Sequence, residues 1–119
     1  MTPISGLDAI TGKTVRLSGV VIQLAPLSFW GGVESSTGRI IDSSHPSYGL
    51  VLAGQIIAMS HARGSSSSSS VLAECLRLKT APKAMLLKFP DPIIIVAVLI
   101  ATELYGATMP VLVVPEEFL

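Results

Sequence analysis

The sequence predicts an α/β fold, with a β-rich first half and a β-α-β-α-β second half. Three short apolar runs, typical of buried strands, lie at residues 56–59, 83–89 and 111–114. Two longer patterns separate these runs, at about residues 70–79 and 93–105, and both are typical of helices. Because parallel strands need long crossover connections, this alternation predicts a small parallel sheet with right-handed crossovers.

The first half is expected to consist of strands joined by turns. Residues 13–25 begin with alternating apolar and polar positions, which predicts one strand that can bend at Gly19. Turns at residues 35–38 and 43–49 enclose a short strand at residues 39–42. Between these strands, the aromatic pair Phe29-Trp30 runs into Gly31-Gly32. This pattern predicts a turn anchored by an aromatic side chain, although a glycine backbone can also approach a ligand closely.

Local residue types define the elements of the second half. Residues 50–59 predict a turn or bend near Gly54, followed by a buried strand. The helix over about residues 70–79 has one apolar face, formed by Val71, Leu72, Cys75 and Leu76.

The second helix has clear boundary residues. Asp91 suits the N-cap, Pro92 the first helical position and Gly106 the residue after the C-terminus. Residues 93–105 are apolar all round, which predicts burial on nearly every side. Residues 116–119 are expected to form a tail.

The stretch Gln55 to Lys79 carries the most distinctive pattern. Between its strand and its helix lie Arg63, Gly64 and six serines, Ser65 to Ser70. The free N–H groups and the dipole at a helix start favour an anion, and an arginine adds a fork of donors for a carboxylate or phosphate. The pattern therefore predicts a polar loop suited to an anion or oxyanion. A flexible serine linker is the competing interpretation, and Ser69 or Ser70 can also simply cap the helix.

Composition excludes several classes of protein. The chain of 119 residues has no formal net charge, so no basic stripe is present to bind nucleic acid. Charged residues make up 13% of the chain, against roughly 25% in ordinary soluble domains. Such a shortage of charge favours an apolar face that a partner subunit or a second copy covers. The alternative is a monomer with a very apolar core.

The chain has one cysteine and two histidines, and this small number limits the metal sites it can form. Cys75 alone cannot form an intrachain disulfide or a self-contained iron–sulfur or cysteine-rich zinc site, and its place on the apolar helix face favours core packing. His45 and His61 are candidates for acid–base or ligand roles, although a lone loop histidine is more often a surface or capping residue. We therefore expect no metal site in this chain.

The sequence also bears on location. No signal peptide is expected, since the N-terminus lacks a basic region followed by an apolar block. The apolar run at residues 93–101 is too short to span a membrane, which takes about 20 residues. Together with the single cysteine, these features predict a cytoplasmic protein with no membrane partner.

The serine loop needs help to perform chemistry. A serine hydroxyl is a poor base and a poor nucleophile unless it is activated, and neither a G-x-S-x-G elbow nor a P-loop pattern is present. Backbone N–H groups and Arg63 could stabilise a serine alkoxide that accepts a proton. Such a site still needs an electrophile, which a partner must supply.

Several segments resemble one known family. They are Gly31-Gly32-Val33, residues 37–42 (TGRIID), His45-Pro46, residues 63–67 (RGSSS), residues 80–82 (TAP) and Asp91-Pro92. In this order they resemble the small, swivel-domain subunit of aconitase-X-type dehydratases, from about Gly19 to Val114. The resemblance implies one swivelling β/β/α domain over residues 1–119, which closes over a large subunit in a heterodimer. It also implies that the large subunit carries the iron or iron–sulfur site.

The resemblance assigns roles to residues of the serine loop. In the wider aconitase-like group the first serine after the loop glycine acts as the catalytic base, which here is Ser65. Arg63, Ser66 and Ser67 would bind substrate or hold Ser65 in place. The glycines Gly64 and Gly32 join this predicted substrate-binding set. The family pattern has a glycine where this chain has Ser68.

Two small-molecule hydroxy acids are associated with this family. Bacterial-type members resemble cis-3-hydroxy-L-proline dehydratases, which form pyrroline-2-carboxylate, and archaeal-type members resemble phosphomevalonate dehydratases. The Arg-Gly-Ser-Ser-Ser form is more similar to the first group. From the residues alone, two other functions remain open: a non-catalytic interaction domain whose serine run is a hinge, and a stand-alone binder of a small molecule.

Overall fold

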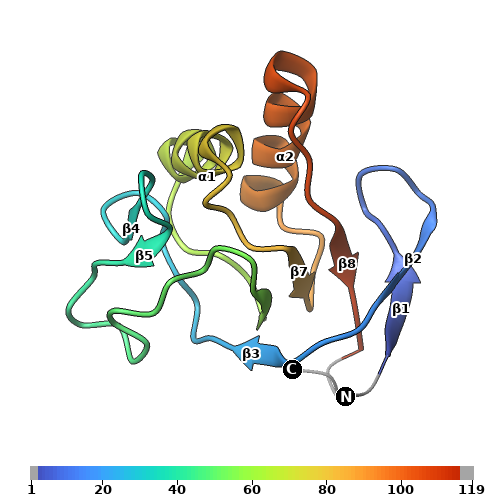
Figure 1. Ribbon diagram of the computed structural model, residues 1–119, viewed down its shortest axis with the longest axis horizontal. Helices are drawn as coiled ribbons and strands as arrows, with labels where there is room; N and C mark the ends of the chain where they lie inside the picture. The colour runs from blue at the N-terminus through green and yellow to red at the C-terminus, as the bar shows by residue number, and fades with distance from the viewer. Residues whose placement is uncertain (1–2, 116–119) are drawn as a thin grey trace.

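The computed structural model describes residues 3–115 and centres on a four-stranded parallel sheet (Figure 1). Its strands are β3 (Val21–Gln23), β6 (Ile56–Met59), β7 (Ala84–Leu87) and β8 (Val111–Val113), in the order β3-β6-β7-β8. Helix α1 (Ser66–Leu78) joins β6 to β7, and helix α2 (Pro92–Tyr105) joins β7 to β8. The predicted parallel β-α-β-α-β half is confirmed.

The molecule has three layers, because both faces of the sheet are buried. Alternate strand residues, including Ile57, Met85 and Val111, pack against the two helices, which lie together on one side of the sheet (Figure 1). Their neighbours, including Ile56 and Leu86, face a separate core beneath the hairpin of β1 (Ile4–Leu7) and β2 (Thr14–Leu17). The predicted β/β/α architecture is thus confirmed, and it explains why β6 and β7 are apolar at every position.

The prediction of one strand over residues 13–25 was wrong. The segment forms β2 and β3, which belong to different sheets. The break lies at Gly19, whose φ of 149° is accessible mainly to glycine. A short hairpin of β4 (Val33–Glu34) and β5 (Arg39–Ile40) completes the first half, and neither β1 nor β4 was predicted.

Helix α1 begins four residues earlier than predicted. Ser65 is the N-cap, rather than Ser69 or Ser70, and the serines from Ser66 onward are helical. Ser68 and Ser69 are buried, so the interpretation as a flexible linker is wrong for this segment. Serine has little helix propensity of its own, and tertiary hydrogen bonds described below hold these residues.

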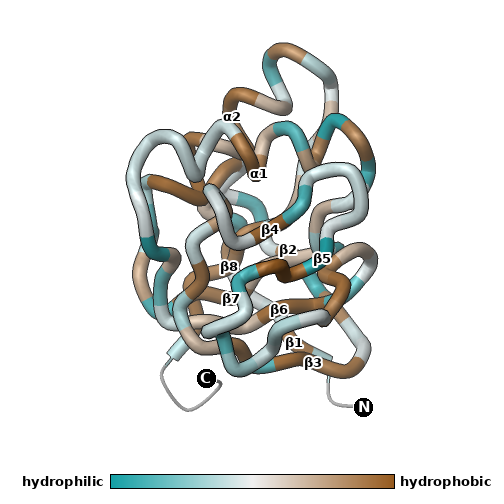
Figure 2. Tube along the Cα trace, turned by 90° about the vertical axis from the view of Figure 1, so that its left-hand side faces the viewer, coloured by the Kyte–Doolittle hydropathy of each residue, from teal (hydrophilic) through white to brown (hydrophobic). Residues whose placement is uncertain are grey.

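Helix α2 has the predicted ends but not the predicted burial. The Asp91 carboxylate caps the N-terminus, Pro92 is the first helical residue, and Gly106 ends the helix at φ 64°. The helix is hydrophobic along most of its length (Figure 2), yet only one side packs against α1 and the sheet. The buried residues are Ile94, Ala97, Val98 and Ala101, and the exposed apolar residues are Val96, Leu99, Ile100, Leu104 and Tyr105. The hydropathy of residues 93–105 could not reveal that α1 and the sheet cover only one side of this helix.

Two further observations concern membrane spanning and the single cysteine. Within residues 3–115, neither helix has the length and hydropathy needed to cross a bilayer. Cys75 is buried in the core against the sheet, as predicted. Burial raises the pKa of the Cys75 thiol above its ordinary value of 9.0, and the nearby Glu74 carboxylate acts in the same direction.

We expect the Asp91→Ala substitution to destabilise the fold by about 2–4 kcal/mol. One carboxylate oxygen accepts from Ala62 N at 2.8 Å and the other from Ile93 N at 2.9 Å, so alanine leaves both amides without their acceptor. Urea unfolding measures the loss. Glu103→Ala, which removes an exposed carboxylate from the same helix, is the control and should change stability by less than about 0.5 kcal/mol. Equal stability of the two variants would contradict this role of Asp91.

The Cys75 thiol should react slowly and should destabilise the fold at alkaline pH. We expect alkylation by iodoacetamide at pH 8 to be at least about tenfold slower in the native chain than in urea, because the thiolate is the reactive form.

A pKa raised by folding gives stability that is lost as pH rises above 9.0, the ordinary value. The difference in unfolding free energy between the chain and Cys75→Ala should therefore shrink above that pH. A difference in unfolding free energy that stays constant to pH 11 would contradict a raised pKa of the Cys75 thiol in the folded chain.

Candidate functional site

The segment from β6 to α1 lies at the carboxyl edge of the parallel sheet, where such folds bind ligands. It is held in place by hydrogen bonds from three directions. Arg63 N donates to Leu27 O at 2.9 Å, and Ala62 N donates to the Asp91 carboxylate at 2.8 Å. The Ser68 hydroxyl donates to Arg63 O at 3.4 Å. The loop is thus fixed before any ligand binds.

The turn at Gly64 requires glycine. Its φ is +105°, and a Cβ at this position would lie 2.4 Å from Ser68 Oγ and 2.9 Å from Ser28 Oγ. Any side chain would push these two hydroxyls away and would strain the backbone. Gly64 therefore lets α1 begin directly after Arg63 without displacing the residues beneath it.

Ser68 joins the start of α1 to the distant turn at residues 28–30. Its side chain is fully buried and lies 3.3 Å from Ser28 Oγ, and it accepts from Trp30 N at 3.3 Å. The residue that departs from the family pattern is thus a packing residue inside α1. Ser69 has a similar role on the other side, because its hydroxyl donates to Ile93 O at the start of α2 at 2.8 Å.

The remaining predicted loop serines face solvent. Ser65, Ser66 and Ser67 are exposed at the start of α1. The Ser65 hydroxyl accepts from Ser67 N at 3.4 Å, a long contact that leaves the oxygen open to a better partner. The oxygen therefore lies among the first amides of the helix, where partial positive charge collects.

Gly32 lies apart from the serine loop surface. It is buried, and a Cβ there would lie 2.0 Å from Ser28 O. Its carbonyl accepts from Ile41 N at 2.8 Å. Gly32 thereby allows the segment carrying Trp30 to pack closely. Its predicted contact with substrate stays a prediction.

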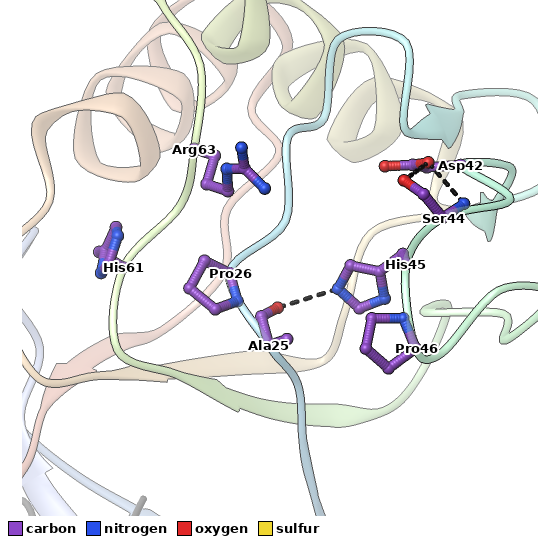
Figure 3. Close-up of a pocket in the computed structure, with 8 residues that line it drawn as sticks. All are labelled: Ala25, Pro26, Asp42, Ser44, His45, Pro46, His61 and Arg63. Carbon is purple, nitrogen blue, oxygen red and sulfur yellow. Dashed lines mark hydrogen bonds between the residues drawn. The ribbon is translucent and has the colours of Figure 1, made fainter.

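A polar cavity of about 380 Å³ lies beside the loop (Figure 3). Arg63 and His61 form one wall, and the segment after β5 forms the other. The lining residues are Ala25, Pro26, Asp42, Ser44, His45, Pro46, His61 and Arg63. Of the predicted substrate-binding residues, the structure places Arg63 in this cavity, and Ser65 follows it by two residues.

His45 is buried, and of the two default expectations for a loop histidine it matches the capping residue and not the surface residue. Its Nε2 lies 3.0 Å from Ala25 O, and its Nδ1 accepts from Ser47 N at 2.9 Å. These contacts fix the tautomer with the proton on Nε2, so His45 ties the cavity walls together (Figure 3). His61 is exposed, with Nδ1 3.0 Å from Ser60 Oγ.

Asp42 is held as a carboxylate. Ser44 donates to Asp42 Oδ1 from its hydroxyl at 2.6 Å and from its N–H at 2.9 Å. These hydrogen bonds hold the pKa of the Asp42 carboxyl below its ordinary value, and the positive charge of Arg63 acts in the same direction. The sequence patterns did not single out Asp42 or Ser44. β3 ends at Gln23, two residues before Ala25 of the cavity, so the cavity lies at the carboxyl ends of both β3 and β6.

No metal centre is evident in the part of the chain that the structure describes. Among residues 3–115, no three His, Cys, Asp or Glu side chains are grouped closely enough to hold an ion.

Comparison with known proteins identifies the family. Residues 7–119 match the aconitase X swivel domain. The chain is 41% identical over 92 residues to cis-3-hydroxy-L-proline dehydratase of Pseudomonas aeruginosa. The aligned region covers 77% of this chain and 16% of that protein. It is 35% identical over 82 residues to the phosphomevalonate dehydratase small subunit of Methanothermobacter thermautotrophicus. This alignment covers 69% of this chain and 63% of that subunit. The matched region is thus about a sixth of the first relative and under two thirds of the second.

The fold comparison agrees with the sequence comparison. The crystal structure of Thermococcus kodakaraensis aconitase X, in its holo form, superimposes with a TM-score of 0.75 and 26% identity, over 94% of this chain and 79% of that chain. A match to nearly the whole chain, together with a common fold, supports the resemblance that the loop motifs indicated. The chain belongs to the aconitase X swivel domain family.

Proposed function

We propose that this chain, residues 1–119, is a single swivel domain and the small subunit of an aconitase-X-type hydro-lyase. The observation that carries the proposal is the joint position of Arg63 and Ser65, at the start of α1 and beside a polar cavity. The relatives include dehydratases of two kinds, and both are proteins larger than the matched region. The reaction is therefore assigned to a complex and not to this chain alone.

Ser65 is the proposed general base. Dehydration of a 3-hydroxy acid removes the proton α to the carboxylate and expels the hydroxyl group from the next carbon. An alkoxide at Ser65 would be stabilised by the first amides of α1, by the helix dipole and by the Arg63 guanidinium. The exposed position of Ser65 leaves it accessible to a substrate held between two subunits.

Arg63 is the proposed anchor for the substrate carboxylate. Its planar fork of donors matches a carboxylate in a bidentate arrangement. Ser66 and Ser67, both exposed, offer hydroxyls and backbone N–H groups to the same ligand. Gly64 and Gly32 contribute by the close backbone packing that their lack of a side chain permits.

The partner is a large subunit that carries an iron or iron–sulfur site, in a heterodimer with this chain. Such a group, when bound, would supply the Lewis acid that accepts the leaving hydroxyl group. The exposed apolar residues of α2 support the presence of a covering partner, since the chain has few charges to solvate its surface.

The proposed substrate is cis-3-hydroxy-L-proline, which dehydration converts to pyrroline-2-carboxylate. Two relatives named for this activity, from Pseudomonas aeruginosa and Hypocrea jecorina, are each 41% identical to the chain. The phosphomevalonate dehydratase small subunits of Methanothermobacter thermautotrophicus and Pyrococcus abyssi are 35% and 36% identical. Phosphomevalonate is therefore the second candidate. A non-catalytic domain with a serine hinge is disfavoured, because the serines from Ser66 to Ser70 form a helix with two buried members.

A set of Ser65 variants in the reconstituted complex tests the base. We expect Ser65→Ala to lower kcat by at least about a hundredfold, in line with the loss of a general base. Ser65→Asn should be equally inactive, although asparagine is as good an N-cap as serine and should preserve α1. Ser65→Thr keeps both the cap and the hydroxyl and should retain part of the activity.

The control is Ser70→Ala, an exposed serine of the same run that lies more than a turn further along α1. Its turnover should match the unmodified complex. Size-exclusion chromatography checks that every variant still assembles. Near-normal turnover by assembled Ser65→Asn would reject Ser65 as the base, whatever the substrate.

A further inference from the structure

Two opposite charges line the polar cavity without pairing. Arg63 and Asp42 lie on facing walls, with the guanidinium and the carboxylate directed toward the space between them (Figure 3). Among residues 3–115, no ion pair within 4 Å joins them. Their charges are nevertheless close enough for Arg63 to act on Asp42. A gap between two such groups can accommodate a ligand that carries both charges.

The Asp42 carboxylate is anchored in a way that leaves one oxygen available. Both hydrogen bonds from Ser44 go to Oδ1, and the other oxygen is directed toward the Arg63 wall (Figure 3). His45, fixed between Ala25 O and Ser47 N, holds the segment that carries Asp42 against the end of β3. The negative wall is thus fixed in position, as is the Arg63 backbone opposite to it.

The cavity has dimensions suited to a small amino acid. Its volume of about 380 Å³ lies at the lower end of the range for small-molecule sites. Arg63 is the member of the predicted substrate-binding set that lines this cavity, so a carboxylate bound to Arg63 places the adjacent carbon inside the cavity. The positive group of an α-amino or α-imino acid is attached to that same carbon, and it can then point to the opposite wall.

We propose that Asp42 is a specificity-determining residue, which binds the ring ammonium of a zwitterionic substrate while Arg63 binds its carboxylate. The inference rests on the proposed function and deepens it, since it names the residue that selects the imino acid. A substrate with a carboxylate but no ammonium leaves the fixed Asp42 charge without a partner. A substrate with a second negative group, such as a phosphate, brings like charges together and is disfavoured.

The alternative role for Asp42 is structural, because its Oδ1 organises the turn at Ser44. Asp42→Asn separates the two roles. The asparagine amide oxygen can still accept from Ser44, so the turn is preserved, but the negative charge is lost. Asp42→Glu keeps the charge and should recover part of any lost binding.

The test uses the complex of this chain with its large subunit, assayed with cis-3-hydroxy-L-proline. We expect Asp42→Asn to raise KM by about 10- to 100-fold, the range for a lost hydrogen bond to a charged group, with a smaller change in kcat. Competitive inhibition gives a second readout. The unmodified complex should bind L-proline, a zwitterion, more tightly than cyclopentanecarboxylate, which has the same ring size and no nitrogen. Asp42→Asn should abolish that preference.

The matched control is Glu34→Gln, which removes an exposed carboxylate of the same half of the chain outside the cavity. It should leave the preference for L-proline unchanged. If the complex dehydrates cis-3-hydroxy-L-proline but Asp42→Asn keeps its KM and its preference, the inference is rejected and the proposed function stands. If the complex acts on phosphomevalonate and not on the imino acid, both the proposed substrate and the role of Asp42 are overturned.

Discussion

The buried hydroxyl of Ser68 is the contact on which the rest of the site depends. It reaches the carbonyl of Arg63, the hydroxyl of Ser28 and the amide of Trp30, so the loop before α1 and the distant turn at residues 28–30 meet at one oxygen. Gly64 leaves the space that this oxygen occupies. The start of α1, the Arg63 backbone and the turn before β4 are therefore positioned by one small polar cluster. A preorganised site of this kind needs little rearrangement when a ligand arrives.

Local signals in the sequence predicted the second half well. Apolar runs located β6, β7 and β8, and the residue types at Asp91, Pro92 and Gly106 located both ends of α2. Each of these features is set by neighbouring residues or by burial on both faces of a sheet. The sheet topology followed from the order of the elements, and in such a topology the loop containing Arg63 lies at the carboxyl edge of the sheet.

Features set by distant residues were not predictable in the same way. The helical state of the serine run depends on bonds from Ser68 and Ser69 to residues 24 to 40 positions away. The partial exposure of α2 depends on where the sheet lies, which hydropathy does not encode. The cavity residues Asp42 and His45 come from a loop that only the fold brings to Arg63. Sequence reasoning therefore named residues of both walls, Arg63 and His61 on one and His45 on the other, but it could not show that they line one cavity or that Asp42 belongs to it.

The serine run also constrains its own length. Its members look interchangeable, yet Ser65 caps the helix, Ser68 and Ser69 point inward, and Ser70 points outward. In an α-helix each residue advances the direction of the side chain by roughly 100°. Gaining or losing a single serine would leave the composition nearly unchanged but would rotate every side chain on one side of the change out of register with its surroundings. The geometry of the helix, rather than the identity of any one serine, therefore makes the length of the run matter to the fold.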